Sequence, residues 1–221
     1  MSYADFVRQT DMMTAPRRTV RGGKLARTLR CAALAGLLLS VPLSAAQATE
    51  FAQMQALLDQ GYYNSAARLN GPDLVARYPE SGKAHFLYAR ALYLTGDLAG
   101  ASTELDQVIA IDGDADPGVV NLQGLLRAAN GDPAGALRAL QNAFLRSRDY
   151  QFAMDWGRVA WQAGRYPEAI AAFDAAATTE RGRKELWPFV DKGRLLVFTG
   201  KLPEAIAAFN AAIDVFEATD P

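Results

Sequence analysis

The 221-residue sequence is poor in the residues that most often build chemical sites. It has one cysteine, Cys31, and one histidine, His85, so the usual four-ligand Cys/His zinc sites cannot form. A serine–histidine–aspartate triad would depend on His85, and the sequence has neither a G-x-S-x-G motif nor a G-x-x-x-x-G-K-[ST] phosphate loop. We therefore expect no metal site, no cofactor and no catalysis.

An excess of basic residues and a long apolar run are also absent. Residues 49–221 carry 16 basic and 22 acidic side chains, a net charge of -6, which does not suit the neutralisation of nucleic-acid phosphates. The clearest apolar run, residues 31–43, has thirteen residues, whereas a membrane span takes about 20. We expect no nucleic-acid partner and, once the leader is removed, no stable membrane span.

Residues 1–48 have the composition of a targeting leader. They hold seven basic and two acidic side chains, a net charge of +5. A basic region, residues 17–30, precedes the uncharged apolar region 31–43, and small residues in an A-x-A arrangement follow. This order is that of a secretory signal peptide, with cleavage expected after Ala48 and, as a second choice, after Ala46. The pattern predicts export to the periplasm or the extracellular space.

Several readings of the leader stay open. An uncleaved segment would serve as an N-terminal anchor, and the Arg17–Arg18 pair allows a twin-arginine signal, although it lies far from the apolar region. Translation from Met12 or Met13 in place of Met1 would shorten the long basic region.

Alanine is the most conspicuous residue, with 42 copies, or about one residue in five. Alanine loses no side-chain entropy in a helix, and its small side chain allows helices to approach closely. No segment alternates apolar and polar residues over a useful length. The composition thus favours a helical fold without a sheet.

Five glycine-led segments recur along residues 49–221. They begin at Gly61, Gly96, Gly131, Gly164 and Gly200, with separations of 35, 35, 33 and 36 residues. A period near 34 that combines a helix, a glycine-centred turn and a second helix resembles the tetratricopeptide repeat. The resemblance implies small residues at the eighth and twentieth positions, where the two helices of a repeat would touch, and with each glycine at the fifteenth position this sequence has small residues there. The eighth positions are Ala89, Gly124, Gly157 and Gly193, and the twentieth are Ala66, Ala101, Ala136, Ala169 and Ala205.

The resemblance implies an all-α, right-handed α-solenoid of about five stacked helix-turn-helix repeats. Their approximate bounds are 49–80, 81–115, 116–148, 149–184 and 185–221. The first repeat departs from the pattern, with Met54 at the eighth position and Asn70 at the twenty-fourth, as expected of a capping repeat.

The family resemblance also implies a partner-binding groove lined by the first helices of the repeats. Arginine occupies the ninth position in three copies, as Arg90, Arg158 and Arg194, with aromatic residues nearby. One interpretation is a groove for an acidic or C-terminal peptide with aromatic anchors. The other is that these arginines pair with carboxylates of neighbouring helices, while Trp161 and Phe198 pack inside. The predicted groove residues are Lys83, Phe86, Arg90, Tyr93, Arg158, Trp161, Trp187, Arg194 and Phe198.

Three smaller clusters have simpler interpretations. The acidic stretch 112–116 imitates half of a calcium loop, but Pro117 and Gln123 replace the glycine and glutamate that such a loop needs, which favours an acidic turn with Asp116 as N-cap. His85 is expected to be a hydrogen-bonded packing residue. The basic cluster Arg181, Arg183 and Lys184 is interpreted as a solvated loop, and the alternative is a small site of contact with an anionic group.

The last helix carries a row of large apolar residues that no further helix covers in this sequence. These residues, Ile206, Phe209, Ile213 and Phe216, predict an end-docking patch. The open explanations are self-association or docking of another chain, a longer array of which this is a fragment, and simple tolerance on the surface.

The leading hypothesis is an exported, non-catalytic scaffold that binds a protein or peptide and assists assembly of an envelope complex. The alternative is a binding subunit for an anionic polymer of the exopolysaccharide type, held by the arginine column. The salt dependence of binding distinguishes these two functions, because polymer binding through Arg90, Arg158 and Arg194 would weaken steeply with ionic strength.

Overall fold

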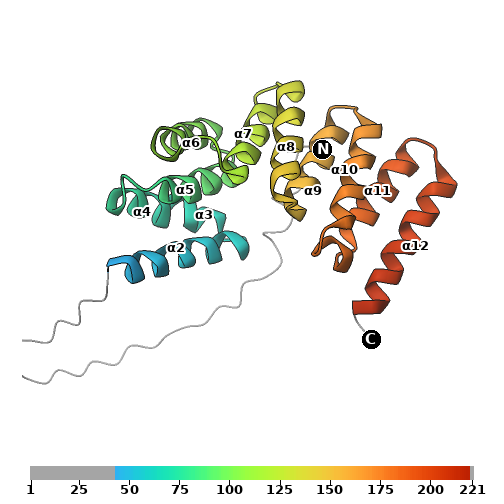
Figure 1. Cartoon of the computed structure of the whole chain (residues 1–221), viewed down its shortest axis with the longest axis horizontal. Coiled ribbons are helices and arrows are strands. Elements are labelled where there is room, and N and C mark those ends of the chain that lie inside the picture. The colour runs from blue at the N-terminus through green and yellow to red at the C-terminus, as the bar shows by residue number, and fades with distance from the viewer. Residues whose placement is uncertain (1–42, 220–221) are drawn as a thin grey trace, which may run out of the picture. The chain divides into compact units, whose positions relative to one another are not determined.

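A computed structural model describes residues 43–219 of the chain. Within this range the secondary structure is helical and contains no strand, and consecutive helices pair and stack along the array (Figure 1). The array confirms the α-solenoid that the repeat predicts.

Each repeat contributes two helices joined at its glycine turn. The first helices are α2 (Leu43–Asp59), α5 (Gly82–Thr95), α7 (Pro117–Ala129), α9 (Tyr150–Gln162) and α11 (Trp187–Phe198). The second helices of repeats two to five are α6 (Leu98–Asp112), α8 (Pro133–Ser147), α10 (Tyr166–Thr178) and α12 (Leu202–Thr219). A short 3-10 turn, Gly182–Lys184, joins α10 to α11.

The turn within each repeat depends on the backbone freedom of glycine. Gly96 ends α5 with a φ of 87°, in the left-handed region that glycine enters without a Cβ penalty. Gly61, Gly131, Gly164 and Gly200 also have positive φ values, as the repeat register predicts. In the second and third repeats the next residue, Asp97 or Asp132, caps the second helix, and the Asp132 carboxylate accepts a hydrogen bond from the Gly135 amide at 2.8 Å.

Small residues at the eighth position allow the two helices of a repeat to touch. Gly157 in α9 faces the fully buried ring of Phe173 in α10, and a Cβ at Gly157 would lie 2.5 Å from that ring. Gly124 faces Leu140 in the third repeat in the same way. This close approach is the contact that the alanine- and glycine-rich positions predict.

The second helix of the first repeat is irregular. It runs as α3 (Tyr63–Ser65), a π-helical turn (Ala66–Asn70) and α4 (Gly71–Arg77). Pro72 lacks the N–H that would continue a regular helix, and wider turns absorb such interruptions. The departure predicted for this repeat therefore takes the form of a widened helix.

The predicted leader lies mostly outside the described residues. Helix α2 begins at Leu43, upstream of the expected cleavage site after Ala48, so its backbone is helical through that site. None of the helices described is both long and apolar enough to cross a membrane. Cleavage and export remain predictions from the sequence.

Candidate groove on the first helices

The C-terminal half of the array carries a hollow of about 290 Å³ between two repeats. Its lining combines α9, the start of α10 and the end of α11. The lining residues are Arg158, Trp161, Gln162, Tyr166 and Phe198. The structure thus brings together three predicted groove residues, Arg158, Trp161 and Phe198.

Aromatic rings give the hollow an apolar wall. The rings of Tyr166 and Phe198 meet edge to face, with centroids 5.5 Å apart and planes at 70°. Phe198 is nevertheless 65% exposed, and Trp161 is half-buried. The structure therefore corrects the expectation that Phe198 packs inside, because most of its ring faces solvent.

Asp191 in α11 connects the two arginines of this region. Its carboxylate is nearly buried and lies 3.4 Å from Nε of Arg158 and 3.6 Å from the guanidinium of Arg194. The Arg194 guanidinium also lies 5.8 Å from the centroid of the Trp161 ring. One carboxylate thus offsets part of two positive charges, so this part of the predicted arginine column is less positive than its sequence suggests.

Predicted residues of the second repeat lie apart from this hollow. The Arg90 guanidinium donates to the side-chain oxygen of Gln55 at 3.1 Å and lies 5.9 Å from the Phe86 ring centroid. Exposed Lys83 lies over the ring of Phe51 at 5.4 Å. Of the other predicted residues, Tyr93 is partly buried against the N-terminal core and Trp187 is 53% exposed at the start of α11.

A polar contact joins the first helices α7 and α9. The Asn121 side-chain amide donates to Asp155 at 2.9 Å, and the Gln151 side-chain amide donates to the other oxygen of the same carboxylate at 2.9 Å. The side-chain oxygen of Asn121 is buried and has no hydrogen-bond partner. Burial raises the pKa of Asp155, and the two amide donors oppose that rise.

Sequence reasoning missed Asp155, Asp191 and Tyr166. A pattern for the two carboxylates was present, since each stands three residues before an arginine, Arg158 or Arg194, at the same place in its repeat. Residues three apart lie on one face of a helix. Position six of the fourth and fifth repeats, which holds Asp155 and Asp191, was therefore a candidate partner for the arginine at position nine.

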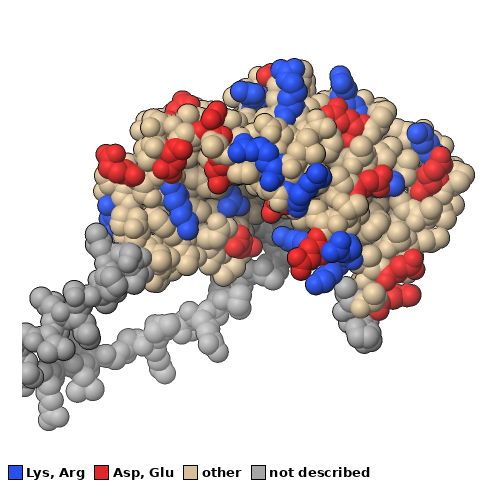
Figure 2. Space-filling model, viewed as in Figure 1, with Lys and Arg blue, Asp and Glu red and all other residues tan. Residues whose placement is uncertain are grey.

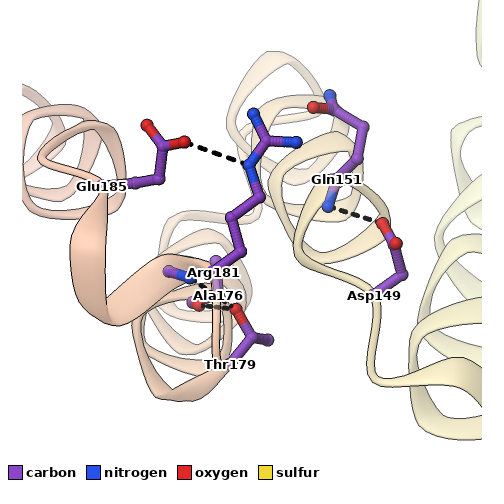
Figure 3. A network of polar contacts seen from close by, with 7 residues as sticks. Asp149, Gln151, Ala176, Thr179, Arg181 and Glu185 are labelled. Carbon is purple, nitrogen blue, oxygen red and sulfur yellow. Dashed lines mark hydrogen bonds and ion pairs between the residues drawn. The ribbon is translucent and has the colours of Figure 1, made fainter.

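The junction between α10 and α11 holds the predicted basic loop. Arg181 donates to Glu185 at 3.0 Å (Figure 3), and its guanidinium lies 4.8 Å from the ring centroid of Tyr150 in α9. Arg183 donates to the Thr178 carbonyl at 3.1 Å. Burial, together with nearby Glu185, raises the pKa of Tyr150 to about 12. Contacts within the chain thus engage two of the three basic residues.

His85 has the packing role that its position predicts. Its Nδ1 lies 2.6 Å from a Glu104 carboxylate oxygen in α6, and its Nε2 lies 2.9 Å from the Pro79 carbonyl. The imidazole therefore links α5 to α6 and to the segment that precedes α5. Asp116 likewise caps α7 by accepting from the Gly118 and Val119 amides at 2.7 and 3.3 Å.

Charge is unevenly spread along the array. Residues 96–116 contain six acidic and no basic side chains, whereas residues 117–148 contain four arginines and one aspartate. Figure 2 shows basic side chains gathered over the middle of the array and acidic ones over α6 and α12. The net charge of -6 is therefore concentrated in residues 96–116 and in α12, whereas residues 117–148 carry a net charge of +3. No group of three or more Cys, His, Asp or Glu residues suited to a metal ion occurs within residues 43–219.

Family models of the tetratricopeptide repeat match residues 57–126 and 121–184, together more than half of the chain. The chain belongs to the tetratricopeptide repeat family. Arrays of this family act as protein-interaction scaffolds, and their members typically bind partners without catalysing a reaction.

Solved structures share this tetratricopeptide fold at low sequence identity. A structure titled pilF from Pseudomonas aeruginosa is 17% identical with a TM-score of 0.62, covering 80% of this chain and 78% of that one. A structure of MamA from Desulfovibrio magneticus is 16% identical with a TM-score of 0.60, covering 79% and 97%. No curated protein sequence matches the chain.

The last helix of the tetratricopeptide array only partly agrees with the predicted end-docking patch. Ile206, Ile213 and Phe216 are 61%, 53% and 52% exposed. Phe209 is turned inward, since a Cβ on Gly193 in α11 would lie 2.6 Å from its ring. The reason is the small eighth position of the fifth repeat, which takes up the ring of Phe209 within the repeat itself.

Proposed function

We propose that the chain is an exported, non-catalytic scaffold that binds a protein or peptide segment along its first helices and assists assembly of an envelope complex. The observation that carries the proposal is the aromatic hollow between Trp161, Tyr166 and Phe198, beside the Arg158–Asp191–Arg194 group. Exposed aromatic side chains beside paired charges are typical of binding hot spots.

The hollow suits one apolar side chain of an extended or helical segment. Its volume of about 290 Å³ is at the low end of ligand pockets, and aromatic rings form much of its wall. A partner side chain that covers Phe198 would remove much of a 65% exposed ring from water. The Arg158 side chain at the same wall offers N–H donors to carbonyl or carboxylate oxygens next to the anchor.

The paired charges favour a peptide over an anionic polymer. A polymer site would need a row of cations whose charge is available to successive ligand groups. Asp191 contacts both Arg158 and Arg194, and Arg90 donates to Gln55. We therefore expect binding that depends mainly on aromatic contacts and only weakly on salt.

The envelope location rests on residues 1–48, with their basic region, apolar region and A-x-A end. Expression of the full chain with a C-terminal tag, followed by fractionation and N-terminal sequencing, tests this part. A mature N-terminus at Thr49 in the exported fraction is expected. A full-length chain in the cytosol would remove the envelope role and leave the groove proposal untouched.

The binding test is a pull-down from envelope extract with the exported chain as bait. Phe198→Ser and Trp161→Ala are expected to lose the partners that the wild type retains, because they remove the apolar wall of the hollow. Leu145→Ser is the matched control, since Leu145 is 53% exposed in α8 and is not among the residues of the hollow. Thermal unfolding of each variant confirms that it is folded.

Two results would count against the groove. If both hollow variants recover the same partners as the wild type, binding does not use this site. If binding survives these changes but falls steeply with salt and with an Arg90, Arg158 and Arg194 triple alanine variant, the anionic-polymer function is favoured instead.

A further inference from the structure

The outer face of α12 is a near copy of a face that another helix covers elsewhere in the chain. Residues 166–178 and 202–214 are identical at nine of thirteen positions. In the first copy, Ile170 of α10 packs against a cluster that contains Leu196 of α11, and Tyr166 meets Phe198. Lys192 of α11 also donates to Asp174 of α10 at 2.6 Å. An amphipathic helix of the α11 kind thus occupies this surface in the fourth repeat.

In the second copy the corresponding residues are exposed. Leu202 and Ile206, which match Tyr166 and Ile170, are 56% and 61% exposed. A capping helix would replace such residues with polar ones.

Two substitutions between the copies run the other way. Ala177 becomes Ile213, which is 53% exposed, and Glu180 becomes Phe216 in the 36-residue register. The face has therefore gained apolar surface where it is open to solvent. Exposed apolar residues in a row mark interaction sites.

We propose that the α12 face docks an amphipathic helix of another protein, one with an apolar stripe like that of α11 and lysine or arginine beside the stripe. The charge follows from the rim of the face, because Glu204, Asp214 and Glu217 are exposed on α12. Lys201, just before the helix, is the one basic residue among residues 199–219. A basic helix complements this rim, as Lys192 complements Asp174 in the copy.

A second copy of this chain fits the face less well. Two α12 helices would bring their acidic rims together. Helix α2, the first helix of the array, has Gln53 where α11 has Lys192, and Ala52 and Gln53 are exposed on it. Head-to-tail docking would therefore place a helix that has two acidic residues, Glu50 and Asp59, and no basic one on an acidic rim.

The test uses a fluorescent, stapled peptide that copies residues 187–199, the helix already seated on the equivalent face. Anisotropy with the full chain measures its affinity. Ile213→Asp is expected to weaken binding by at least about tenfold, because it puts a charge in the apolar seam. Leu69→Asp is the matched control, since Leu69 is 68% exposed in the first repeat.

A gain-of-binding variant makes the test independent of folding losses. Asn210 stands where Asp174 pairs with Lys192, so Asn210→Asp rebuilds the carboxylate for the peptide lysine. We expect it to tighten the peptide by about two- to fivefold at low salt, with a smaller gain at high salt. Asp214→Asn combined with Glu217→Gln is expected to weaken it.

Each outcome of the peptide-binding test either supports or contradicts the proposal. Binding that Ile213→Asp abolishes and Asn210→Asp strengthens supports the proposal. Failure of the wild-type chain to bind the peptide, or binding that Ile213→Asp leaves unchanged, overturns it. Sedimentation that reveals a dimer dissolved by Ile213→Asp also overturns it, because the occupant is then a second copy.

Discussion

Replacing Gly157 with alanine isolates the contact that holds the two helices of the fourth repeat together. The new Cβ would lie 2.5, 2.7 and 3.0 Å from three atoms of the Phe173 ring, closer than side-chain carbons normally approach. Phe173 is fully buried, so its ring has no free volume into which to move.

Two effects of this substitution oppose each other. Alanine gains about 1 kcal/mol over glycine in the interior of a helix. Overpacking of a core by a methyl group costs about 1–3 kcal/mol, and the immobile ring places this site at the upper end of that range. We expect a net loss of about 1–2 kcal/mol and a fall in Tm of about 2–8 °C for an array of this size.

Gly193→Ala is the matched control, because its geometry is the same and the freedom of its neighbour differs. A Cβ on Gly193 would lie 2.6 Å from the ring of Phe209, which is only partly buried in the last repeat and can shift toward solvent. Here the helix propensity gain offsets most of the packing cost, so the net change is expected to be close to zero. The difference in unfolding free energy between Gly157→Ala and Gly193→Ala therefore measures how firmly the facing phenylalanine ring is held.

Thermal and urea unfolding, followed by circular dichroism, decide the outcome. Combining Gly157→Ala with Phe173→Leu makes room for the new methyl group, so the pair should be less destabilised than the sum of the single variants. The packing argument is refuted if Gly157→Ala is as stable as the wild type, or if Gly193→Ala costs more.

Three further predictions concern single side chains. Asp155→Asn is expected to stabilise the fold by about 1 kcal/mol at pH 7, since it removes a partly buried charge and keeps a side-chain oxygen that still accepts from the Asn121 amide. Because the pKa of Asp155 is raised in the folded state, its ionisation lowers the free energy of unfolding as pH rises through that pKa. Unfolding measured between pH 3 and about 7 should show this decrease in the wild type and not in the variant. The raised pKa of Tyr150, about 12, keeps the phenol neutral in the fold, so stability should fall from about pH 10 to 12 by about 2 kcal/mol, and Tyr150→Phe should flatten that slope. Asp132→Ala removes the N-cap of α8 and should cost about 1 kcal/mol, with Asp132→Asn nearly neutral in the same unfolding assay; an equal loss in both would argue against capping.

Short-range chemistry in the sequence was enough to predict the fold. The glycines at a period near 34 set the turns, since Gly96 and its counterparts need a backbone region that other residues rarely adopt. Gly157 and the other small residues at the eighth position predicted where helices touch. Asp116 before Pro117 predicted the start of α7. The glycine turns and the Asp116 cap act within a few residues of themselves, so they can be read from the sequence, whereas the contacts at the eighth position followed from the family resemblance.

The pairing of charges and the placement of aromatic rings depended on the tertiary structure. Asp191 reaches Arg158 from 33 residues away, across two neighbouring first helices, and so offsets part of the charge that the arginine column implies. Phe198 faces solvent beside Tyr166, and Phe209 turns inward over Gly193, although both are phenylalanines of the same repeat. The sequence by itself determined the helices, their turns and their order. Which side chains meet was decided by how neighbouring repeats stack, because a contact between repeats depends on the distance and angle between helices that no local pattern encodes.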